Sequence, residues 1–182
     1  MRLIATLLLF GTSSCGVLPN ASAGQRDHDG FEAQARAIDG DTIAVDFRLF
    51  GADAVERKAL CAKGPSCWPC GKAAQDFASK LMKREPVSIR LTGQQSYGRP
   101  IAVVDVGGQD LGETMIAAGY AVPTPNFLKT DPMRARRYEA AFAQAEARHL
   151  GIHGGEFIEP SRWRKGARLS CERRERFGGD ER

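Results

Sequence analysis

The chain has 182 residues, a length that fits one domain with tails. Hydrophobic residues make up 42% and charged residues 26% of it, which is typical of a folded protein and too apolar for a disordered one. This composition excludes a collagen, a coiled coil and a protein with several membrane spans. The longest apolar run, Leu3 to Phe10, is far shorter than the ~20 residues of a membrane-spanning helix, so we expect no membrane span.

The first residues have the layout of a secretory signal. Arg2 supplies a positive start, an apolar run follows, and Ala21-Ser22-Ala23 places small residues before a cleavage point. We therefore predict a signal peptide over residues 1–23 and a periplasmic or secreted location. A lipid anchor on Cys15 is disfavoured because Thr12, three positions earlier, stands where an aliphatic residue is required.

The cysteines indicate disulfide bonds. Cleavage of the signal leaves Cys61, Cys67, Cys70 and Cys171, an even number in an oxidising compartment, and the count alone leaves three pairings open. Because three of them lie within ten residues, we predict a bond between Cys61 and Cys70 that staples this loop to the helix after it.

Two other roles for these cysteines are possible, a redox site and a zinc site. The Cys67-Trp68-Pro69-Cys70 motif resembles a thiol–disulfide oxidoreductase site, but such a site sits in a βαβ unit and the flanking chain has the pattern of barrel strands. The four cysteines, or some of them with His149 or His153, have ligand types that suit zinc. In an exported protein disulfides are favoured over zinc.

The positive charge is concentrated at the C-terminus. The formal net charge is +4, and residues 161–182 hold eight Lys or Arg against four acids, so this basic tail carries the whole excess. Two interpretations stay open: the tail binds a polyanion such as nucleic acid, or it is a solvated end.

The early and middle parts of the chain predict strands. Residues 24–34 form a polar linker, and the alternation of apolar residues over residues 43–49 is typical of a half-buried strand. Asp39-Gly40 is a turn signal that makes residues 35–38 the partner strand of a hairpin. Further strands are predicted over residues 87–92 and 101–106.

Three helices are predicted among and after these strands. The first follows apolar residues from Ala73 to Met82, the second begins at the capping residue Asp110, and the third begins at Asp131-Pro132 and turns Tyr138 toward the core. The order of strands, helix, strands and two helices favours a small β-barrel with helices packed outside over a doubly wound sheet.

Three short segments concentrate carboxylates and arginines: DGDT at residues 39–42, RLFGADAVE at residues 48–56, and YGR at residues 97–99. Carboxylate and main-chain oxygens hold hard divalent cations, and arginine forks match phosphate oxygens. Carboxylates, a cation and arginines are the groups that phosphoryl transfer uses.

In this order the segments resemble the staphylococcal nuclease (thermonuclease) family, in its exported proteobacterial branch. The family pattern is DGDT, then R-L-x-G-I-D-A-P-E, then D-x-Y-G-R, and the resemblance runs from about Ala35 to Arg164. It implies a mainly β fold with α, an OB-fold with a five-stranded barrel and three packed helices, over residues 35–160. It also implies a Ca²⁺-dependent nuclease that acts on DNA and RNA, as a monomer and with single strands favoured.

The resemblance assigns roles to residues by position. Asp41 and Asp53 would be carboxylate ligands of Ca²⁺, and Ala54 would supply a main-chain carbonyl as a third ligand.

Three further positions would be catalytic. Glu56 would activate the attacking water, and Arg48 and Arg99 would clamp the phosphate. Val55 replaces the family's proline before the glutamate and removes a fixed φ from the loop that aims Glu56, which puts the rate in question.

The alternative is a protein without catalysis. The OB-fold is a general binding scaffold, and some family members are binding or accessory proteins, for example in exopolysaccharide (succinoglycan) biosynthesis. The full set of carboxylates and arginines favours the nuclease.

Overall fold

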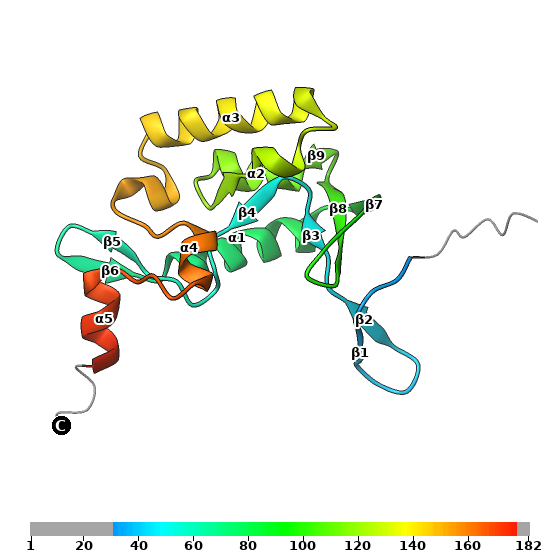
Figure 1. The fold of residues 1–182 in the computed structure, drawn as a ribbon, viewed down its shortest axis with the longest axis horizontal. Helices are drawn as coiled ribbons and strands as arrows, with labels where there is room; N and C mark the ends of the chain where they lie inside the picture. The colour runs from blue at the N-terminus through cyan, green and yellow to red at the C-terminus, as the bar shows by residue number, and fades with distance from the viewer. Residues whose placement is uncertain (1–30, 178–182) are drawn as a thin grey trace, which may run out of the picture. The chain divides into compact units, whose positions relative to one another are not determined.

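The structure is a computed structural model that describes residues 31–177, with side chains described as far as Arg173 (Figure 1). The predicted signal peptide, Cys15 and most of the predicted linker lie outside the described residues. None of the helices within the described part has the length and apolar character needed to cross a membrane.

The elements have the following bounds. The strands are β1 (Ala35–Ala37), β2 (Ile43–Val45), β3 (Arg48–Leu49), β4 (Ala52–Ala54), β5 (Cys61–Lys63), β6 (Ser66–Trp68), β7 (Val87–Ser96), β8 (Arg99–Val106), β9 (Gln109–Asp110) and β10 (Ala121–Pro123). The helices are α1 (Cys70–Arg84), α2 (Leu111–Ala117), α3 (Pro132–Ala147), α4 (Pro160–Arg164) and α5 (Ser170–Phe177), with 3₁₀ turns η1 (Pro125–Phe127) and η2 (Gly151–Gly154).

The predicted hairpin at the start of the domain is confirmed, but its second strand is shorter than expected. β1 and β2 pair antiparallel, with Ala35 opposite Val45, and the chain leaves this ladder at Asp46. β3 then pairs in parallel with β8 instead. The hairpin stands apart from the helices (Figure 1), and its apolar Ile38 and Ile43 are 60% and 70% exposed.

The central sheet is built on β8, which is buried along most of its length. Its strand order is β3–β8–β7, with β9 pairing on β8. β7 and β8 are joined by the two-residue turn Tyr97-Gly98, in which both φ angles are positive (52° and 72°). A turn with positive φ at both central residues is a type I′ turn, whose twist suits a hairpin.

The described strands do not close into a barrel. Besides the central sheet there are three two-stranded sheets, which pair β1 with β2, β4 with β10 and β5 with β6. The broader prediction of a mixed fold of sheets with packed helices is confirmed. The five-stranded closed barrel is not formed over residues 31–177, because the β1–β2 hairpin pairs only with itself.

Helices α2 and α3 begin where the sequence predicts, α1 begins earlier than predicted, at Cys70, and α4 and α5 had no predicted counterpart. Asp110 caps α2 by accepting a hydrogen bond from the Glu113 amide (3.1 Å), and Asp131 caps α3 in the same way from the Arg134 amide (3.0 Å). The core lies between these helices, α1 and β8. Tyr138 is buried in it, as its position on the helix predicts.

Both disulfides involve the loop after β4. Cys61 pairs with Cys70, which confirms the predicted staple, and Cys67 pairs with Cys171, which ties β6 to α5. All four cysteines within residues 31–177 are therefore bonded, and none of these is left to hold zinc. Leu169, Cys171 and Glu172 are buried, so the described part of the basic tail is folded against the domain.

Candidate active site

Asp53 lies at the centre of the candidate site, in the short strand β4. The strand is preceded by a sharp turn at Gly51, whose φ of +76° favours glycine. A Cβ at this position would also overlap the side chain of Leu128, so the turn is packed closely. Asp53 itself is only 8% exposed.

Two arginines hold the carboxylate of Asp53. Arg48 donates from Nη2 to Oδ1 (3.1 Å), and Arg164 donates from Nη2 to Oδ2 (2.6 Å) and from Nη1 to Oδ1 (3.1 Å). Arg164 also donates from Nη1 to Oε1 of Glu56 (2.7 Å). The hydrogen bonds to Asp53 raise the pKa of Arg164 above its ordinary value; burial opposes them, and Glu56 adds to them.

The loop that carries Glu56 is fixed by its main chain. The Glu56 carbonyl accepts from the Ala59 amide (2.7 Å), and the Ala59 carbonyl accepts from the Gly71 amide (3.1 Å). Gly71 lies in the first turn of α1, so closely against this loop that a Cβ there would overlap the Glu56 carbonyl. The Cys61–Cys70 bond holds the same junction.

Val55, which stands where the family pattern has proline, does not leave this loop loose. Its amide donates to the Tyr120 carbonyl (3.1 Å), a bond that proline is unable to make. Its side chain is 5% exposed. A hydrogen bond and packing thus restrain the backbone that a proline ring would otherwise restrain.

A cavity of about 230 Å³ opens beside Asp53. Its wall is formed by both arginines and by side chains of four separate segments. The lining residues are Arg48, Leu49, Ala52, Asp53, Ser96, Tyr97, Ile101, Thr124, Phe127, Ser161 and Arg164. The ring of Tyr97 is 85% exposed, and the Arg48 guanidinium lies 6.0 Å from its centre.

Neither Asp41 nor Arg99 is among the residues that line this cavity. Asp41 is in the turn of the β1–β2 hairpin, where its Oδ1 accepts from the Thr42 hydroxyl (3.2 Å). Arg99 begins β8 and is not among the residues that line the cavity. Its charge acts on Asp46, whose pKa is lowered first by Arg36 and to a smaller extent by Arg99.

The family model described as staphylococcal nuclease homologue matches residues 46–153. The chain belongs to the staphylococcal nuclease family. The match includes Arg48, Asp53, Glu56 and Arg99, but Asp41 precedes it and Arg164 follows it. A comparison with curated proteins finds no match.

In this arrangement Arg48 and Arg164 take up the Asp53 oxygens that the family's Ca²⁺ would use. Both carboxylate oxygens of Asp53 accept hydrogen bonds from guanidinium groups. Over residues 31–177, no three His, Cys, Asp or Glu side chains gather in a way that suits a metal ion. The ligand set Asp41, Asp53 and Ala54 therefore stays a prediction from the resemblance.

Arg164 is the site residue that sequence reasoning missed. It was counted with the charges of the basic tail, 108 positions after Glu56. The signal that pointed to it was the Pro160 and Trp163 stretch, where the resemblance to the family ends. No local pattern shows that α4 returns to β4.

A larger cavity, of about 570 Å³, lies between α2, α3 and the β8–β9 turn. Four of the five charged groups on its wall are paired with one another: Arg134 with Asp110, and Arg137 with Glu113 (2.9 Å). The Arg134 and Asp110 side chains are only 9% and 10% exposed, whereas Arg164 beside Asp53 is 35% exposed, so this cavity is a weaker candidate for chemistry than the one beside Asp53.

Proposed function

We propose that this member of the staphylococcal nuclease family hydrolyses phosphodiester bonds of nucleic acid. The observation that carries the proposal is that Arg48 pairs with the buried carboxylate of Asp53 beside an open cavity, and that Arg164 joins Asp53 to Glu56, which lies outside the cavity lining. Family membership supports the same substrate class. The proposal also keeps the monomeric state that the resemblance implies.

In the proposed reaction Glu56 is the general base. It is 32% exposed and Arg164 engages its Oε1, so Oε2 is the oxygen that accepts a proton from water. The water oxygen forms a bond to phosphorus, and the bond from phosphorus to the leaving sugar oxygen breaks. The leaving oxygen takes its proton from solvent.

Arg48 has the second role, that of stabilising the charge that builds up on the phosphate. Its side chain is 18% exposed and forms part of the cavity wall, so its guanidinium is pre-positioned and partly shielded from water. Charge-assisted hydrogen bonds in such a setting are worth more than in bulk water. Arg99 as a second phosphate arginine, and Ca²⁺ held by Asp41, Asp53 and Ala54, are part of the proposal on the resemblance alone.

The place of action is proposed to be the periplasm or the cell exterior. Two disulfides fit an oxidising compartment, where such bonds persist. The single strand is the favoured substrate, DNA or RNA.

The test is incubation of the purified mature protein with single-stranded DNA, in millimolar Ca²⁺ and in parallel with a chelator. We expect cleavage with Ca²⁺ and about a 10²-fold loss of turnover in Glu56→Gln, which keeps the size of the side chain but is a far weaker base. Glu139→Gln, an exposed substitution on α3, is the matched control and should cleave like wild type.

The binding or accessory protein remains the second hypothesis, and the same assay separates the two. That hypothesis expects DNA to be bound and left intact in Ca²⁺. Such a result for the wild-type protein would rule out the nuclease proposal.

A further inference from the structure

The C-terminal segment brings a charged residue into the candidate site from outside the region matched to the family. Arg164 ends α4, and its guanidinium spans the carboxylates of Asp53 and Glu56 with three hydrogen bonds of 2.6 to 3.1 Å. Its side chain is 35% exposed, so solvent and ions reach it from one side.

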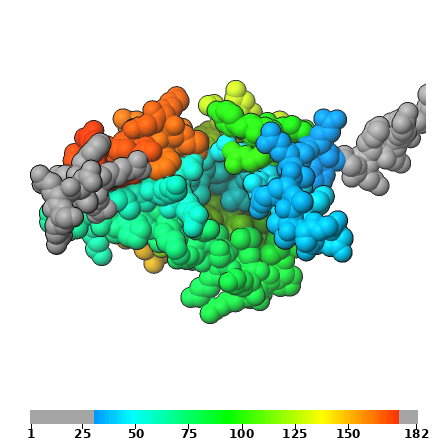
Figure 2. All heavy atoms as spheres, turned by 90° about the horizontal axis from the view of Figure 1, so that it is seen from below, coloured from blue at the N-terminus to red at the C-terminus, as the bar shows by residue number. Residues whose placement is uncertain are grey.

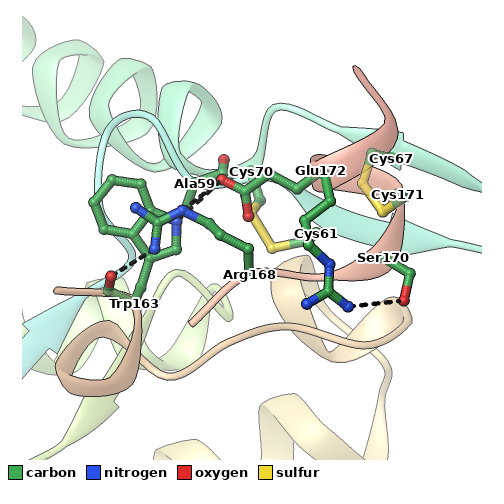
Figure 3. The surroundings of a disulfide bond; sticks show 10 residues. Ala59, Cys61, Cys67, Cys70, Trp163, Arg168, Ser170, Cys171 and Glu172 are labelled. Carbon is green, nitrogen blue, oxygen red and sulfur yellow. Dashed lines mark hydrogen bonds and ion pairs between the residues drawn. A yellow bond between two sulfur atoms is a disulfide. The ribbon is translucent and has the colours of Figure 1, made fainter. Parts of the chain in front are cut away.

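The position of Arg164 is fixed, because several contacts hold the chain on either side of α4. Pro160 is buried at its start. After it, Arg168 stacks over the Trp163 ring (3.7 Å to the centre) and donates to the Trp163 carbonyl (2.6 Å). Figure 3 shows this stack beside Glu172, which accepts from the Trp163 indole (3.3 Å).

A disulfide bond fixes the far end of this C-terminal segment. Cys171, next to Glu172, is bonded to Cys67 on β6, so residues 160–173 are tied to the domain at their far end as well. Figure 2 shows the orange C-terminal segment lying against the cyan and teal part of the chain that carries β4 to β6. We call residues 160–173 the C-terminal strap.

The guanidinium of Arg164 gives the carboxylates of Asp53 and Glu56 a neighbouring positive charge, as a divalent cation would. It brings positive charge between two acids and satisfies both oxygens of Asp53 together with Arg48. Hard cations need the same carboxylate oxygens as ligands. The same carboxylate oxygens cannot bind the Arg164 guanidinium and a divalent cation at the same time, so the two cations must compete.

We propose that Arg164 is the resident counter-ion of Asp53 and Glu56, and that a divalent cation binds at Asp53 only by displacing it. The inference rests on the proposed function for the identity of the centre, and it adds a residue of the strap to it. Arg164 is a positioning residue here, because it acts through the two carboxylates.

The experiment measures Ca²⁺ binding itself, by titration calorimetry of the mature protein at fixed pH and salt. Arg164→Gln should bind Ca²⁺ at least about fivefold more tightly than wild type, the lower end of ordinary coupling between two ligands. Arg162→Gln is the matched control: it removes the same charge from the same helix, and among the described residues its side chain makes no ion pair. It should leave the affinity unchanged.

Arg164→Lys provides a second variant should the glutamine variant fold poorly. Lysine keeps the charge but loses the planar fork that reaches two carboxylates at once. Its Ca²⁺ affinity should therefore lie between those of wild type and Arg164→Gln. Equal or weaker Ca²⁺ binding in both Arg164 variants than in wild type would overturn the inference, as would a gain of the same size in Arg162→Gln.

Failure of this inference differs from failure of the proposed function. Cleavage of single-stranded DNA by wild type with unchanged Ca²⁺ affinity in the Arg164 variants rejects the counter-ion and keeps the nuclease. Tighter Ca²⁺ binding in those variants with no cleavage by any of them keeps the counter-ion and rejects the nuclease.

Discussion

Two clusters of arginine and carboxylate in this molecule use the same groups to different ends. The Arg134 cluster consists of Arg134, Asp110, Asp131 and Tyr138, and joins the starts of α2 and α3. The Arg164 cluster consists of Arg164, Asp53, Glu56 and Arg48, and joins β4 to the C-terminal strap. Both lie beside a cavity.

They differ in burial and in spare bonding capacity. The side chains of Arg134 and Asp110 are 9% and 10% exposed, and the Tyr138 hydroxyl donates to Asp110 (2.8 Å) while accepting from Arg134 (3.3 Å). Burial lowers the pKa of Arg134, but the bonds to Tyr138 and Asp131 raise it further, so the net shift is upward. In the other cluster, about a third of the Arg164 and Glu56 side chains is exposed.

The solvent exposure of its side chains, more than their residue type, separates a structural ion pair from one that is available for chemistry. A saturated buried pair has no group free to meet a substrate, and breaking it is costly. A pair open to solvent is exchanged cheaply for an ion or a phosphate. The predictions below test this difference.

The largest effect is expected for Arg134→Met, which keeps the length of the side chain and removes its charge. Asp110 would then be a buried carboxylate without its cation, and the free energy of unfolding should fall by about 3–5 kcal/mol. Arg164→Met should cost less, because Asp53, although only 10% exposed, keeps Arg48 as its partner and the Arg164–Glu56 pair is partly exposed. Urea unfolding of the mature chain measures both, and equal losses would contradict the comparison.

The second effect concerns the tether of the strap. Replacing Cys67 and Cys171 by serine removes a bond that spans 104 positions and should lower the free energy of unfolding by about 3 kcal/mol. Amide hydrogen exchange should speed up in residues 160–173 and stay unchanged around Arg134. Replacing Cys61 and Cys70, which span 9 positions, should cost about 2 kcal/mol. Exchange that speeds up around Arg134 as well would show that the two clusters are not independent.

Gly71→Ala tests whether the close contact between Gly71 and the Glu56 carbonyl positions Glu56. The new Cβ would overlap the Glu56 carbonyl, so the loop must shift, at a cost of about 1–3 kcal/mol in unfolding free energy. Because small displacements of a catalytic group are expensive, turnover on single-stranded DNA should fall about tenfold or more. Gly154→Ala is the control, since a Cβ there comes no closer than 3.4 Å to the His149 carbonyl. Equal turnover in the two variants would mean that this contact does not position Glu56.

The smallest effect is expected for Tyr138→Phe, about 1 kcal/mol for the lost hydrogen bond to Asp110. Burial, and then the charge of Asp110, raises the pKa of Tyr138 above its ordinary value of 10.0. The unfolded chain therefore loses this proton first, and unfolding free energy should fall as pH rises above 10. The Phe variant should lose less stability over that range than wild type, and an identical slope would contradict the assignment.

Local patterns in the sequence determined the first hairpin, the long strands β7 and β8 and the helices α1 to α3, but not the short strands β4, β5, β6, β9 and β10 or the helices α4 and α5. Asp110 and Asp131 mark helix starts because a side-chain oxygen caps the amides of the next turn, and both do so here. The period of apolar residues placed Tyr138 in the core, and three crowded cysteines predicted the Cys61–Cys70 bond. The order of the carboxylate and arginine segments identified the family.

Tertiary structure alone decided which charges meet. Asp41 and Asp53 are 12 positions apart, yet Asp41 lies in the turn of the β1–β2 hairpin and Asp53 in β4, because the chain leaves the β1–β2 ladder at Asp46 and pairs next with β8. Arg164 reaches Asp53 across 111 positions because the Cys67–Cys171 bond and the Trp163 stack fold the C-terminal strap back onto the domain. Local patterns report hydrogen bonds and packing between near neighbours, and they carry no information on which distant segment a charged side chain contacts.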